Sequence, residues 1–116
     1  MNSNQYEILL NQLFDCSSAI QKAIETDDFV ELDNLIKIKN EKIELIDLNK
    51  KFFKKTPQVI EKINKIKAQD ACNLELIINK KQAIQKKVQN NMANLKILKV
   101  YEQVQENNGS IVDINE

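Results

Sequence analysis

The chain has 116 residues, equal numbers (17 each) of basic and acidic side chains, and a hydrophobic content of 42%. With one glycine and one proline, it has little room for hairpins, glycine-rich phosphate loops or a barrel, so long amphipathic helices are expected. All basic residues are lysine and histidine is absent, which argues against nucleic acid as the main partner and against an enzyme.

The first helix is predicted from about Ser3 to Glu25, with Ser3 as its N-terminal cap. Its apolar positions recur at steps of three and four, which places them on one helix face. They are Tyr6, Leu9, Leu10, Leu13, Phe14, Ile20 and Ile24, with Ser17 among them. Cys16 in this helix and Cys72 later in the chain both fall in apolar stripes. We expect two buried free thiols, with a disulfide or redox switch as the alternative.

The second helix is predicted from about Phe29 to Lys54. Asp28 is its expected cap, and Glu31 stands three residues later, as in a capping box. Capping also explains the Asp27-Asp28 pair better than a cation site does. The main apolar positions are Phe29, Leu32, Leu35, Ile36, Ile43, Ile46 and Phe53, and the stripe is widened by Val30, Ile38, Leu45, Leu48 and Phe52. A stripe of this width predicts contacts on two sides.

The third helix is predicted to begin at Pro57, with Thr56 as its cap. No further proline or glycine occurs before Gly109. Its face is marked by Val59, Ile60, Ile63, Ile66, Leu74, Ile77, Ile84, Val88, Met92, Leu95, Leu98 and Tyr101. Asp70 and Asn73 lie on or near this face, where hydrogen bonds across the bundle would fix its register.

The third helix is longer than the two before it. The short connection at Thr26–Asp28 makes the first two helices antiparallel neighbours. A third helix that runs back from Pro57 comes level with Phe29 at about Lys81. The next stretch, from about Ala83 to Val104, extends about 30 Å at 1.5 Å per residue and has no partner from the first two helices. It can bend near Asn90-Asn91 and fold back, pair with a second copy, or lie along a helix of another protein.

The predicted fold is an all-α antiparallel three-helix bundle with a long third helix that overhangs or folds back as a fourth helix. Residues 1–106 form one helical domain, and residues 107–116 form a flexible C-terminal tail. The predicted partner-binding face consists of Ile84, Val88, Met92, Leu95, Leu98 and Tyr101. No catalytic residue, cofactor or metal ligand is predicted. The absence of a signal pattern and of long apolar runs favours a cytoplasmic protein without a membrane span.

Several segments together resemble a known family. The segment 28–39 (DFVELDNLIKIK) is similar to the second-helix signature of small flagellar export chaperones of the FliT/FlgN type. The pattern formed by Ile63, Ile66, Asp70, Asn73, Leu74 and Ile77 also fits. So do the Lys99-Val100-Tyr101 step and the ending 109–113 (GSIVD). The resemblance extends from about Tyr6 to Asp113, with lysine where the family usually has arginine.

The resemblance implies a cytoplasmic chaperone that binds the C-terminal helical segment of a late flagellar substrate. The expected client is the filament cap protein, with the hook–filament junction proteins as the second candidate, and delivery is to the export apparatus. The alternative is a structural or adaptor coiled-coil protein that forms a homodimer through the third helix.

Overall fold

A computed structural model describes residues 2–87 and 92–110 of the chain. These residues form α1 (Ser3–Glu25), α2 (Phe29–Asn49), a short 3-10 helix η1 (Lys50–Phe52), α3 (Pro57–Lys87) and α4 (Met92–Ser110), with no strand in the described ranges. The bundle is elongated, 51 × 21 × 20 Å. The predicted all-α class is confirmed.

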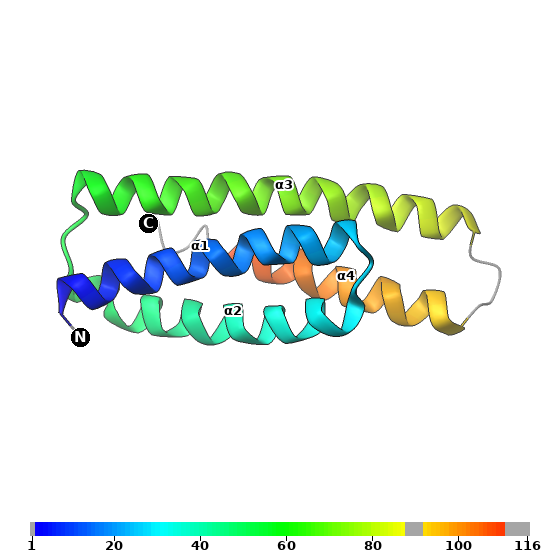
Figure 1. The fold of residues 1–116 in the computed structure, drawn as a ribbon, viewed down its shortest axis with the longest axis horizontal. Helices are drawn as coiled ribbons and strands as arrows, with labels where there is room; N and C mark the ends of the chain where they lie inside the picture. Colours follow the sequence, from blue (N-terminus) through cyan, green and yellow to red (C-terminus); the bar gives the residue numbers. More distant parts are fainter. Residues whose placement is uncertain (1, 88–91, 111–116) are drawn as a thin grey trace.

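The long third segment folds back on itself as two helices, α3 and α4, which is one of the three arrangements predicted from the sequence. α1 packs against both α2 and α3, and α4 packs against α3 and α2 on the other side of the bundle. Figure 1 shows α3 and α4 reaching past the turn between α1 and α2 as a helical pair. We call residues 82–87 and 92–98 the α3–α4 extension. The Asn90-Asn91 weak point lies outside the described residues, between the two helices.

The predicted register of α3 against the first two helices is confirmed by an ion pair. Lys80 Nζ lies 2.9 Å from a carboxylate oxygen of Asp27, in the turn between α1 and α2. The sequence predicted that the third helix comes level with Phe29 at about Lys81. The helix lengths and the two short connections therefore set the register almost to the residue.

The helix starts follow the capping rules, with one correction. Asn2, not Ser3, caps α1: its side chain accepts from the backbone N–H of Gln5, and the Gln5 side chain accepts from the N–H of Asn2. Asp28 caps α2 by accepting from Glu31 N–H at 3.2 Å. The Thr56 hydroxyl accepts from Val59 N–H at 3.2 Å, as expected for the residue before Pro57. Each cap satisfies a backbone donor that the helix leaves unpaired.

Two boundaries differ from the prediction. α2 ends at Asn49 rather than Lys54, because the chain tightens into η1 and becomes extended at Phe53. Phe53 thereby turns onto the bundle and stacks on Tyr6 at 4.7 Å between ring centroids. At the other end, α4 continues to Ser110, so positions 107–110, expected in the tail, are helical. Residues 111–116 lie outside the described residues.

The core is divided into two apolar clusters. We call the first the base cluster; it joins the start of α1, the end of α2 and the start of α3 through Tyr6, Leu9, Leu10, Leu13, Ile43, Ile46, Val59, Ile63 and Ile66. The second is the α4 cluster, built from all four helices by Cys16, Ile20, Ala23, Ile24, Leu32, Leu35, Ile36, Ile77, Tyr101 and Val104. Between the two lies a buried polar layer.

Candidate protein-binding surfaces

The predicted partner-binding face is divided by the fold. Tyr101 is completely buried in the α4 cluster, and Ile84 is half-buried against it. Leu98 is half-buried, whereas Leu95 is 42% exposed. Val88 and the Met92 side chain lie outside the described residues. Of the six residues, Leu95 is therefore the one shown to be open to solvent, and Tyr101 is a core residue.

The burial of Tyr101 differs from the prediction, which extended one helical stripe from α3 into α4. α4 packs back against α3 as a separate helix, so the inward face of α4 does not follow from the stripe of α3. In α4 the inward positions are Ile97, Val100, Tyr101 and Val104, at steps of three and four. Leu95 and Leu98 lie beside this inward stripe rather than on it.

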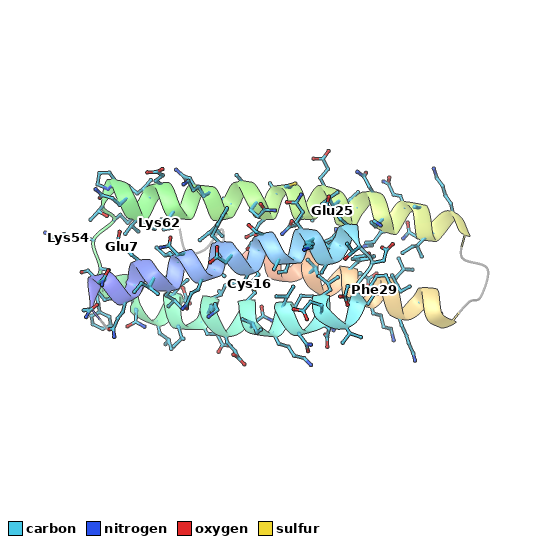
Figure 2. All side chains as sticks on the ribbon, viewed as in Figure 1. Glu7, Cys16, Glu25, Phe29, Lys54 and Lys62 are labelled. Atoms are coloured by element: carbon cyan, nitrogen blue, oxygen red, sulfur yellow. The ribbon has the colours of Figure 1, made fainter. Side chains whose placement is uncertain are left out.

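Tyr101 is held by residues around the turn between α1 and α2. Its ring and that of Phe29 form a T-shaped pair at 5.8 Å between centroids. Its hydroxyl lies 3.5 Å from an Asp27 carboxylate oxygen, which also pairs with Lys80. Figure 2 shows Phe29 at this end of α2, beside α4. The acidic turn therefore connects the α1–α2 hairpin to both α3 and α4.

Asp27 adopts a left-handed backbone conformation, with φ of 55°. The N–H of Asp28 bonds to the Ala23 carbonyl at 2.9 Å and the N–H of Asp27 to the Ile24 carbonyl at 3.3 Å, which is a Schellman ending of α1. Glycine usually fills this position, because a side chain costs about 1 kcal/mol there. Asp27 offsets that cost through its contacts with Lys80 and Tyr101.

The environment of Tyr101 predicts an unusual alkaline titration. Burial raises its pKa to about 12, and the nearby Asp27 carboxylate adds to the effect. Burial also raises the pKa of Tyr6, the other tyrosine. Because the folded chain holds the Tyr101 proton more tightly than the unfolded chain, this group's contribution to stability is complete below pH 10 and is lost as the pH rises toward 12.

Phenolate absorbance during a pH titration measures this effect. We expect no tyrosine of the folded protein to ionise with the ordinary pKa near 10. Tyr101→Phe should remove the uppermost step and make the alkaline loss of stability shallower. An ordinary titration of both tyrosines, while circular dichroism still reports a folded chain, would contradict the buried placement.

The polar layer between the two clusters contains a buried ion pair. Lys39 Nζ lies 2.8 Å from an Asp70 carboxylate oxygen, and the two side chains are 1% and 6% exposed. Burial raises the pKa of Asp70, although the Lys39 ammonium opposes that rise. Asn73 donates to the backbone oxygen of Ser17 at 2.8 Å. The expectation that Asp70 and Asn73 bond across the bundle is confirmed, whereas Lys39 had not been singled out in the sequence.

The two cysteines differ in exposure. Cys16 is buried near the middle of α1, and its Sγ donates to the Leu35 backbone oxygen at 3.3 Å. Burial raises the pKa of its thiol, which lowers its reactivity. Cys72 is exposed, contrary to the prediction, at the edge of a shallow cavity of about 470 Å³ between α1 and α3. Both thiols are free.

A second apolar surface lies along α2. Its outward side carries Ile38, Leu45 and Leu48, and Phe52 follows in η1. All four are exposed, and we call them the outer α2 face. They belong to the set that widened the predicted α2 stripe, for which the sequence implied contacts on a second side. The described part of the bundle provides no such contact, and Leu48 and Phe52 are 73% and 78% exposed. The sequence pattern indicated this surface, although the predicted partner-binding face lies on the third helix.

The described residues hold no group of three or more acidic or cysteine side chains positioned to bind a metal ion. No helix in the described ranges combines the length and apolar character needed to cross a membrane. Comparison with protein-family models, curated proteins and solved structures gives no match. The candidate protein-binding surfaces are the exposed apolar side chains on α2 and on the α3–α4 extension, because these side chains are open to solvent.

Proposed function

We propose that this protein is a flagellar export chaperone that binds the C-terminal helical segment of a late flagellar substrate. The observation that supports the proposal is the α3–α4 extension, a helical pair that reaches past the other two helices with apolar side chains still open to solvent. Leu95 is exposed, and Ile84 and Leu98 are partly so. An amphipathic client helix binds such a surface by adding a third helix to the pair.

Charge favours an acidic or neutral client at this surface. Exposed lysines surround the apolar side chains of the extension: Lys86 on α3, and Lys96 and Lys99 on α4. They raise the rate of encounter with an acidic segment more than the final affinity. The filament cap protein is the first client to test and the hook–filament junction proteins are the second. In this proposal the protein acts in the cytoplasm, is not an enzyme, and holds its client unassembled until delivery to the export apparatus.

Titration calorimetry of the full chain with a peptide from the C-terminal segment of the cap protein tests the proposal. We expect Leu95→Asp to weaken binding at least tenfold, equivalent to about 1.4 kcal/mol, because a carboxylate would be desolvated against the client. Leu48→Asp is the matched control, since it places the same charge on α2, away from the extension, and should leave the affinity unchanged.

Two results would count against this function. If neither the cap segment nor a junction-protein segment binds the wild-type chain, the chaperone proposal fails. If Leu48→Asp and Leu95→Asp weaken the complex equally, the client does not use the α3–α4 extension.

A further inference from the structure

α4 covers only part of the side of the bundle on which it lies. Tyr101 meets Phe29 at the start of α2, and from there α4 runs parallel to α2 (Figure 1). Its last residue, Ser110, therefore comes level with about Ile38, whereas α2 continues to Asn49, about 16 Å further at 1.5 Å per residue. We call the rest of this side the base strip; its borders are the end of α2 and the start of α3, residues 39–49 and 57–70.

The side of α2 that meets α4 continues into the base strip. Ile36 and Ile43 follow Phe29 at steps of seven residues, almost two turns, and so lie on nearly the same side of the helix. Ile36 belongs to the α4 cluster and is 4% exposed, and Ile43, beyond the end of α4, is 8% exposed. Burial is thus nearly the same where α4 covers α2 and where no described helix takes its place.

The side of α3 that meets α4 also continues into the base strip. Lys81 donates to the Gln105 side chain of α4 at 2.8 Å. Lys67 lies fourteen residues before Lys81, and Ile63 lies eighteen residues, or five turns, before it, so both are on about the same side of α3. Ile63 is almost completely buried and Lys67 is half-buried. The base strip therefore has an apolar floor with a lysine at its α3 border.

The segment that follows α4 has the length to cover this strip. Residues 111–116 (IVDINE) continue from Ser110, on the side of the bundle where α4 lies. Six extended residues span about 20 Å, which is enough to reach the end of α2. Val112 and Ile114 share one side of an extended chain, and Asp113 and Asn115 share the other. The segment therefore offers an apolar side to the floor and a polar side to solvent.

Charge favours the same placement. The connection 50–56 carries four lysines and no acidic residue. The nearest acidic residues of α2 are Asp47, which pairs with Lys50 at 2.9 Å, and Glu44, one turn earlier. Lysines thus outnumber carboxylates at this end of the strip. Residues 111–116 contain two acidic residues and no lysine, so the segment and the end of the strip have opposite charge.

We propose that residues 111–116 lie extended along the base strip of their own chain. Val112 and Ile114 pack on the floor formed by Ile43 and Ile63, and Glu116 comes near the basic connection 50–56. The segment extends the line of α4 to the far end of the bundle. It uses none of the residues proposed for client binding, so either proposal can fail without the other.

Paramagnetic relaxation enhancement in the full chain tests this placement. A nitroxide is attached at Asn115→Cys, with Cys72→Ser present so that the exposed native thiol is not labelled; Cys16 is buried. We expect strong broadening of amides at the end of α2 and the start of α3, and none near Leu95. The same label at Gln103→Cys, an exposed position on α4, is the matched control and should broaden the α1–α2 turn instead.

Amide hydrogen exchange tests what the contact contributes. Ile114→Asp places a carboxylate against the apolar floor and should lower the protection of amides near Ile43 and Ile63 about tenfold. Asn115→Asp is the matched control, because it adds the same charge one residue further on, on the side that faces solvent. It should change protection by less than about threefold.

Three results would overturn the proposal. The first is a label at Asn115→Cys that leaves the ends of α2 and α3 unbroadened, or that broadens the α3–α4 extension instead. The second is an equal effect of Ile114→Asp and Asn115→Asp on exchange. The third is broadening seen only when the label and the isotope are on different molecules, which would assign the strip to the segment of a second copy. Circular dichroism of each variant establishes that the helical bundle is retained.

Discussion

Asp70→Leu is expected to lower the free energy of unfolding by about 3–5 kcal/mol. The substitution removes the carboxylate 2.8 Å from Lys39 Nζ and leaves that ammonium almost completely buried. A buried charge without its counter-ion costs several kcal/mol even after the surroundings relax. Because small domains have only about 5–15 kcal/mol of stability in total, the variant should unfold at a much lower urea concentration than the parent.

The double variant Lys39→Met/Asp70→Leu separates the cost of an unpaired charge from the value of the ion pair. Replacing both partners with apolar side chains should recover most of the stability, and it can exceed the parent value. Urea denaturation followed by circular dichroism measures all three chains. Glu61→Leu is the control, because Glu61 pairs with Lys65 at 3.8 Å on the surface and should change stability by less than about 1 kcal/mol. A small effect of Asp70→Leu would show that Lys39 reaches water or another polar partner in the variant.

Tyr101→Ala is the second large expected effect, at about 3–5 kcal/mol. Tyr101 is the largest fully buried side chain that α4 contributes, and it contacts both Phe29 and Asp27. Its truncation leaves a cavity beneath a helix that is attached through few other buried residues. Tyr101→Ala should therefore destabilise the packing of α4 on the bundle more than it destabilises the α1–α2 hairpin.

Amide hydrogen exchange distinguishes local from global loss in Tyr101→Ala. We expect protection to fall along α4 while the amides of the base cluster, near Leu10 and Ile46, change least. Tyr101→Phe keeps the ring and loses only a long hydrogen bond of 3.5 Å, so its cost should stay near 1 kcal/mol or below. Equal loss of protection in all four helices would mean that the bundle opens as one unit.

The helix positions and the bundle could be predicted because their signals are local. Caps at Asp28 and Thr56, the proline after Thr56 and the period of the apolar residues determine where the helices begin and which faces pack. Two short connections then fix the level at which Lys80 meets Asp27. The cap at Asn2 was not predicted because a serine follows it, and both residue types cap helices well.

The surfaces were harder to predict because they depend on how helices are placed in space. The sequence left open whether the third segment continues straight or folds back, and folding back changes which α4 residues face inward. The burial of Lys39 was not predicted, because a single lysine within an apolar stripe usually extends its long side chain so that the ammonium reaches solvent. Only the position of Asp70 on α3, which lies across the bundle from α2, shows that Lys39 is paired. The outer α2 face was marked by a wide apolar stripe, but width alone does not say which side the bundle leaves uncovered.

Asp27 gives the molecule a form of reciprocal coupling. Its left-handed backbone is stabilised in part by contacts of its carboxylate with Lys80 and Tyr101, so the conformation of the α1–α2 turn and the docking of α4 favour each other. By thermodynamic linkage, a ligand that draws α4 away from the turn lowers the population of the left-handed turn, and a ligand that reshapes the turn loosens α4 by the same free energy. Asp27→Gly would uncouple the two, because glycine holds the left-handed turn without help from the other helices.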